Sequence, residues 1–175
     1  KFILKKPKNS WNKFDSILCK PISVKGHKKM KLIKRGWKNI LGDPSVLVNK
    51  GKHNIKLHFD MHHGYGVLDK AINVLSSKDR NGFRKYVETN NKFNPNIMYI
   101  SKKKILDRWF KDLFKWLFRC EKIFGTKQLK GYDQERLYAY LAERYLPFWF
   151  KKYTRSTVCD WGYYDFSKEK SKKIS

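Results

Sequence analysis

The chain is 175 residues long, which is the size of one domain, and 41% of its residues are hydrophobic, which excludes a disordered protein. Three widely spaced cysteines exclude a disulfide framework and a Cys-based zinc site. Because the apolar runs are short and no signal segment opens the sequence, we expect neither a transmembrane nor a secreted chain. A formal net charge of +26 points to an anionic partner such as nucleic acid, a lipid headgroup or a phosphorylated substrate, and the alternative is a generic basic surface of evenly scattered lysines.

The first 66 residues are predicted to form short strands separated by turns. Ser16–Lys20 is largely apolar and ends at Pro21, and residues 46–48 form a second apolar run behind a proline. A third strand is predicted where apolar residues alternate with polar ones, at Ile55, Leu57, Phe59 and Met61.

The pattern changes to helical spacing at Val67. Helices are predicted over residues 67–75 and 81–89, followed by a brief strand at residues 97–100. The longest helix should run from a cap at Ser101 to about Phe124, with Gly125 just past its end. The aromatic residues of this helix are interpreted as core: Trp109, Phe110, Phe114, Trp116 and Phe118.

A second long helix is predicted over residues 133–146, where Pro147 should stop or kink it. The two long helices should pack through these residues: Leu106, Trp109, Phe110, Leu113, Leu117, Leu137 and Leu141. No repeat or linker divides the chain. We therefore expect one domain over residues 1–166, followed by a disordered basic tail over residues 167–175.

The densest group of polar side chains follows the third predicted strand. His62 and His63 precede two glycines, and Asp69 lies one turn into the next helix. The N–H groups at a helix amino terminus favour an anion, so this junction could bind the diphosphate of a nucleotide sugar. Satisfied or exposed histidines are the alternative, and the spacing matches no specific metal motif.

Charged side chains also recur on the second long helix. Arg136 and Glu143 lie two turns apart and should share a face, and Glu143-Arg144 stands among apolar residues. A partly buried carboxylate there could bind sugar hydroxyls or act as a base. An ordinary network of ion pairs along the helix is the alternative.

Five segments between residues 14 and 153 occur in a recognisable order. They are Phe14–Pro21, His62 or His63 with Leu68-Asp69, Met98–Lys103, Trp116–Phe118 with Glu121-Lys122, and Arg136 with Leu141–Arg144. In this order they resemble a family of bacterial glycosyltransferases from capsule and exopolysaccharide gene clusters, long known only as a domain of unknown function. Cys19 stands where the family has proline, and Ile97 where it has asparagine, with Asn94 and Asn96 displaced upstream.

The resemblance implies an α/β fold, namely the carboxy-terminal portion of a GT-A-like nucleotide-sugar transferase with short strands first and long helices behind. The family's amino-terminal nucleotide-binding part has almost no counterpart in this sequence. The enzyme would move a sugar from a nucleotide-sugar donor to a growing capsular, lipopolysaccharide or exopolysaccharide glycan, on a glycan or lipid-linked acceptor.

The resemblance also implies roles for individual residues. Asp69 and Glu143 are expected to be catalytic. Substrate binding is expected of His62, His63, Asn94, Asn96, Arg136 and Arg144. No cofactor is required by these residues, although a divalent ion, Mg or Mn, is compatible with such chemistry.

A non-enzymatic basic module that binds nucleic acid or another anionic partner is the alternative function. Of the 41 basic residues, 33 are Lys and eight are Arg, and Arg is the residue that binds phosphate bidentately, so nucleic acid is disfavoured. We expect a cytoplasmic protein whose charge supports loose peripheral contact with anionic phospholipid on the inner face of the plasma membrane.

Overall fold

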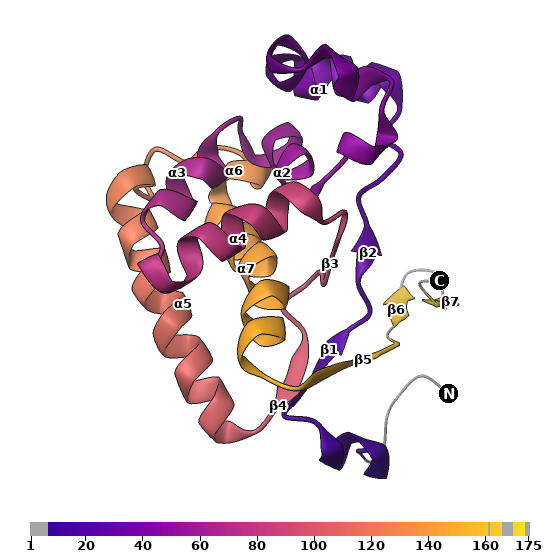
Figure 1. Ribbon diagram of the computed structural model, residues 1–175, viewed down its shortest axis with the longest axis vertical. Coiled ribbons are helices and arrows are strands. Elements are labelled where there is room, and N and C mark those ends of the chain that lie inside the picture. Colours follow the sequence, from indigo (N-terminus) through magenta and orange to yellow (C-terminus); the bar gives the residue numbers. More distant parts are fainter. Residues whose placement is uncertain (1–6, 161, 166–169, 174–175) are drawn as a thin grey trace.

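The computed structural model describes residues 7–160, 162–165 and 170–173, and it combines many helices with a few short strands (Figure 1). The α-helices are α1 (Lys29–Gly42), α2 (Ile55–His63), α3 (Val67–Asn73), α4 (Ser77–Thr89), α5 (Lys103–Phe124), α6 (Tyr132–Glu135) and α7 (Leu137–Tyr153). The strands are β1 (Ser16–Cys19), β2 (Ile22–Ser23), β3 (Lys92–Phe93), β4 (Tyr99–Ser101), β5 (Ser156–Cys159), β6 (Gly162–Asp165) and β7 (Lys170–Lys173). Three short 3-10 helices are η1 (Asn9–Lys13), η2 (Pro44–Leu47) and η3 (Lys50–Lys52).

β1 is the central strand of a three-stranded sheet with the order β4-β1-β5. It pairs antiparallel with β4 and parallel with β5, and Ile17 lies opposite both Ile100 and Thr157. All four residues of β1 are buried, as an apolar strand in the middle of a sheet requires. The apolar run before Pro21 was therefore predicted correctly as a strand, and the prediction for residues 97–100 was correct for its second half.

The main core lies between α7 and the helices around it, with α5 along the outer edge of the helical body (Figure 1). Trp109 and Leu113 on α5 are buried with Leu137 and Leu141 on α7, which confirms the predicted packing at those four positions. Leu106 and Leu117 are half-buried, whereas Phe110 is 41% exposed, so its assignment to the core was wrong.

The predicted aromatic core of α5 is only half correct. Trp109 and Trp116 are fully buried, but Phe110, Phe114 and Phe118 form an exposed row in which neighbouring rings lie 6.0 and 6.2 Å apart. The helix begins after Lys102 rather than at a Ser101 cap, since the Ser101 hydroxyl donates to the Asp15 carbonyl.

The strand predicted over residues 55–61 is a helix. Leu57 and Met61 face a small core shared with α1, while Ile55 and Phe59 face the main core. A helix that buries two opposite faces places apolar residues at every second position, which imitates the period of a strand. The alternation was real, but its cause was burial on both sides.

Two further amino-terminal predictions were wrong. Residues 46–48, predicted as a strand, lie at the end of η2, where the Asp43 carboxylate accepts the Ser45 N–H group. The region predicted as turns between residues 24 and 42 contains α1, a helix of 14 residues with a kink at Gly36. A Cβ at Gly36 would lie 3.3 Å from Met61 Cγ, so the absent side chain permits close packing of α1 on α2.

Pro147 does not stop the second long helix, which continues to Tyr153. Residues 144–150 are all buried, so tertiary packing outweighs the hydrogen bond that a proline removes. The predicted tail over residues 167–175 lies mostly outside the described residues. Within it, Lys170–Lys173 forms β7, which pairs antiparallel with β6.

Replacing Leu113 by Ala should lower the free energy of unfolding by about 2–5 kcal/mol, because the side chain is buried between α5 and α7. Urea denaturation of the wild type and the variant would measure the difference. Phe114→Ala, one position along the same helix and 48% exposed, is the matched control and should change stability by less than about 1 kcal/mol. Equal losses for the two variants would contradict the assigned faces of α5.

Candidate functional site

The Glu143 carboxylate joins the helical body to the loop between β3 and β4. Its Oε1 accepts the backbone N–H of Asn96 at 3.0 Å, and its Oε2 accepts the guanidinium of Arg144 at 2.8 Å. The side chain is 14% exposed, so the carboxylate lies at the edge of the interior. A carboxylate with one charged donor and one backbone donor has further lone pairs that can accept hydrogen bonds from hydroxyl groups.

The loop that Glu143 holds has a strained backbone. Asn96 and Ile97 have φ angles of 62° and 35°, a region that residues with a Cβ rarely adopt and that is least favourable for a β-branched side chain. The loop is tied to the end of β1 as well, because the Asn94 amide donates to the Cys19 carbonyl and the Cys19 thiol donates to the Pro95 carbonyl. Such strain persists only where the surroundings fix the conformation, and it gathers at functional sites.

Arg144 is 2% exposed, which is rare for a charged residue. Its guanidinium stacks 3.8 Å from the centre of the Phe93 ring and points towards His58, with 3.4 Å between Nη2 and Nδ1. Burial lowers the pKa of Arg144 to about 10 despite the neighbouring Glu143, so the group remains charged at neutral pH. Because a guanidinium only donates, the contact with His58 requires a neutral Nδ1 lone pair.

All five histidines of the chain lie in one line of ring contacts, with His58 in the middle and His53 and His63 at its ends. On α2, His58 and His62 are one turn apart with ring centres 4.7 Å apart, and the His63 ring stacks on Tyr140 of α7. In the other direction, His27 lies 5.6 Å from His58 and 5.5 Å from His53. The Arg35 guanidinium on α1 approaches His62 Nδ1 to 3.2 Å.

Burial, and next the charges of Arg144 and the neighbouring histidines, lower the pKa of His58 to about 2. Burial and the nearby Lys31 also lower the pKa of His27. His58 and His27 are therefore neutral at physiological pH, and their rings act as hydrogen-bonding and stacking surfaces beside the buried Arg144 cation.

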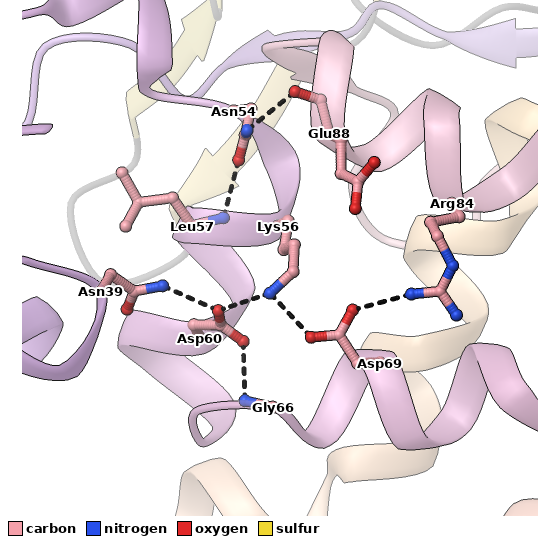
Figure 2. Close-up of polar contacts among 9 residues, drawn as sticks. All are labelled: Asn39, Asn54, Lys56, Leu57, Asp60, Gly66, Asp69, Arg84 and Glu88. Carbon is pink, nitrogen blue, oxygen red and sulfur yellow. Dashed lines mark hydrogen bonds and ion pairs between the residues drawn. The ribbon is translucent and has the colours of Figure 1, made fainter. Parts of the chain in front are cut away.

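Asp69 belongs to a different group of side chains. Figure 2 shows Lys56 between Asp60 and Asp69, at 3.1 and 2.8 Å, with Arg84 3.2 Å from the other oxygen of Asp69. On α2, Lys56 and Asp60 are placed on the side opposite His58 and His62, because positions two apart on a helix differ by about 200°. The structure thus does not bring Asp69 to Glu143.

The buried Asp60 carboxylate ties three elements together in the same group. It accepts the Asn39 amide of α1 at 2.9 Å and the Gly66 N–H at 3.1 Å, in addition to Lys56 (Figure 2). Although burial opposes it, the ion pairs with Asp69 and Asp60 raise the pKa of Lys56. This arrangement orients α1 and the start of α3 and is structural in character.

The remaining predicted site residues divide in two. Asn94, Asn96, His62 and Arg144 lie around Glu143 and His58. Arg136 lies at the break between α6 and α7, where its exposed guanidinium stacks on Tyr132 at 4.3 Å, so a face shared with Glu143 stays a prediction. His58 was not predicted as a site residue. Its spacing of four from His62 would have identified it, had the segment been interpreted as a helix.

A divalent ion has no evident place in this site. In the described ranges, no group of three or more His, Cys, Asp or Glu side chains could hold a metal. The histidine rings stack on one another and on Tyr140 instead of converging on one point. The chain's own residues therefore do not fit the Mg or Mn site that the resemblance allows, and no step is derived through a metal.

Comparison with known proteins gives one match. A family model described as "Domain of unknown function (DUF4422)" matches residues 14–155, a range that contains Cys19, the histidines, the strained loop and Glu143-Arg144. A comparison with curated proteins finds no match, and a comparison with solved structures finds none.

The buried, neutral His58 side chain should make stability depend on pH. The unfolded chain binds a proton at His58 below pH 6.5, whereas the folded state excludes that proton. The contribution of His58 to the free energy of unfolding should therefore be fully present above pH 6.5 and be lost as the pH is lowered. One such proton corresponds to about 1.4 kcal/mol per pH unit. The His58→Gln variant keeps an acceptor for Arg144. Between pH 6.5 and about 5, its free energy of unfolding should fall less steeply than that of the wild type.

Urea midpoints at several pH values would measure the two slopes. The difference between the two slopes isolates His58, because the other titratable groups are the same in both proteins. Identical slopes for the wild type and His58→Gln would show that His58 is protonated or solvated in the folded protein, contrary to its packing.

Proposed function

The chain belongs to the DUF4422 family of unknown function, and we propose that it is a glycosyltransferase, which moves a sugar from a nucleotide-sugar donor to a growing glycan. The observation that carries the proposal is the position of Glu143, a carboxylate fixed by Arg144 and by the strained Asn96 backbone at the end of β1. The ends of strands are where α/β folds commonly bind ligands.

Glu143 can serve sugar transfer in two ways. Its oxygens can accept hydrogen bonds from sugar hydroxyls, which recognise pyranose rings by their pattern of donors. It can also receive the proton that the acceptor hydroxyl loses when it attacks the anomeric carbon. The Arg144 guanidinium holds one oxygen of the carboxylate and the Asn96 N–H holds the other, so the carboxylate is in position before a substrate binds.

The leaving diphosphate needs positive charge or N–H donors. His62 and the exposed Arg35 guanidinium lie together on the α1 side of the cluster and are our candidates for this role. Beyond them, the neutral imidazoles of His58 and His27 offer hydrogen-bonding groups without adding charge. Asn94 supports the site indirectly, because its amide holds the end of β1.

The proposal extends to the whole domain and its surroundings. The fold would be the carboxy-terminal portion of a GT-A-type transferase, working in the cytoplasm on capsular, lipopolysaccharide or exopolysaccharide glycans with a glycan or lipid-linked acceptor. Asp69, paired with Lys56 and Arg84, would orient α3 instead of acting on substrate. No helix of the described residues is long and apolar enough to cross a membrane, and the lipid-linked acceptor would have to be reached from the bilayer surface.

Two matched variants of the protein expressed from its complete coding sequence test the proposal. Glu143→Asp keeps the negative charge beside Arg144 but withdraws the carboxylate, and it should lower transfer about a hundredfold. Asp69→Asn alters the other cluster and should retain transfer within about threefold. The assay is release of nucleoside diphosphate from a panel of nucleotide sugars in the presence of glycan or lipid-linked acceptors.

Glu143→Gln is less suitable, because it leaves the buried Arg144 charge without its carboxylate and should destabilise the fold by about 3–5 kcal/mol. Melting temperatures of both test variants separate loss of fold from loss of chemistry. If no nucleotide sugar is turned over by the wild type, or if Asp69→Asn abolishes transfer while Glu143→Asp does not, the assignment is wrong.

A further inference from the structure

α1 exposes a continuous apolar stripe that faces away from the rest of the molecule. Met30, Ile33, Trp37 and Leu41 are between 50% and 73% exposed and follow one another at intervals of three and four residues. The opposite side of the helix carries the buried Leu32 and Gly36. In Figure 1, α1 stands at the top of the molecule, away from the main helical body.

The charged side chains of α1 are all basic. Five of its 14 residues are Lys or Arg and none is acidic, and the whole stretch from Ser16 to Gly42 contains no Asp or Glu. Viewed down the helix, Lys34, Lys38 and Lys31 follow next to the apolar stripe. A helix with an apolar face that includes Trp and a Lys-rich flank is the pattern of segments that lie in the interface of a membrane.

The rest of the protein holds this face in position. Leu32 packs with Val46, Leu57 and Met61 in a small core of its own, and the Asn39 amide donates to the buried Asp60 carboxylate. The apolar stripe is therefore not a loose helix waiting to fold back onto the domain. Its exposed side chains are fixed outward by packing on the reverse side.

We propose that α1 docks the protein on an anionic lipid bilayer, with Met30, Ile33, Trp37 and Leu41 entering the headgroup boundary and the adjacent lysines contacting lipid phosphates. The partner is an anionic phospholipid surface, and the docking does not depend on sugar transfer. Each Lys near such a surface contributes about 1 kcal/mol, and the apolar side chains add the burial of their exposed area.

Charge complementarity favours a bilayer over the other candidate partners. A second copy of this chain would bring another five basic residues against α1, which like-charge repulsion opposes. Nucleic acid would match the charge, but it would leave Met30, Ile33 and Leu41 without apolar contacts. The exposed phenylalanine row of α5 is less suited, because Asp107 and Glu121 lie on that side of the helix.

Docking through α1 would bring the candidate site close to the lipid. α1 lies on α2, and the Arg35 guanidinium of α1 is 3.2 Å from the His62 ring. A lipid-linked molecule in the same bilayer would then reach Arg35 and His62 without leaving the surface.

Vesicle flotation of the full chain tests the proposal, with phosphatidylcholine vesicles that contain or lack phosphatidylglycerol. The wild type should bind only the anionic vesicles, and binding should weaken as salt is raised. Trp37→Ser combined with Leu41→Ser should lower binding about tenfold or more without loss of melting temperature, because both side chains are exposed. Lys34→Gln combined with Lys38→Gln should lower it as well.

Phe110→Ser combined with Phe114→Ser on α5 is the matched control and should bind like the wild type. Four outcomes would overturn the proposal. The first is that the wild type fails to float with anionic vesicles. The second is that the α1 serine variant binds as well as the wild type, and the third is that the α5 control loses as much binding as the α1 serine variant. The fourth is a self-association in light scattering that the α1 serine variant abolishes, which would assign this face to a second copy of the chain.

Discussion

The interior of this protein has to accommodate a guanidinium. Arg144 is almost completely enclosed, and a charge removed from water must be compensated by an opposite charge, hydrogen bonds or a π-face. Three elements supply this: α7 with Glu143, β3 with the Phe93 ring, and α2 with His58. Since Glu143 also holds the Asn96 backbone, the conformation of the loop before β4 depends on the same buried cation. The candidate site is thus a consequence of satisfying one charge.

Two other polar groups build the scaffold around it. Asp60 and Asp69, with Lys56 and Arg84, connect α1, α2, α3 and α4 on the far side of α2. Asp79 of α4 is fully buried and accepts hydrogen bonds from Tyr145, Tyr153 and Lys152 of α7. Although burial opposes it, these contacts hold the pKa of Asp79 below its usual value, so the carboxylate stays ionised inside the core. Helices that share few backbone contacts are thereby fixed relative to one another.

Helix α1 carries part of the strong basic charge and also contacts the candidate site. A charge of +26 spread over the surface would serve only loose attraction, but α1 concentrates lysines beside apolar side chains at one end of the molecule. The same helix contributes Arg35 to the histidine cluster. Surface binding and the recognition of a phosphorylated substrate would therefore use neighbouring parts of one element, which suits an enzyme whose acceptor is anchored in lipid.

The sequence alone determined those helices and strands in which the pattern of apolar residues has a single physical explanation. β1 is an apolar run ended by a proline, and α5 has a single buried face with Gly125 in a left-handed conformation at its end, so both were predicted nearly to their limits. Glu143 and Arg144 were identified because charges among apolar residues are unusual. Only the tertiary structure decided that residues 55–63 form a helix, since burial between two cores gave them the period of a strand. It likewise decided that α7 continues through Pro147, that Arg136 is exposed, and that Asp69 lies on the opposite side of α2 from His58 and His62. Those outcomes depend on which surfaces pack against one another in the tertiary structure, and the local spacing of residue types does not encode them.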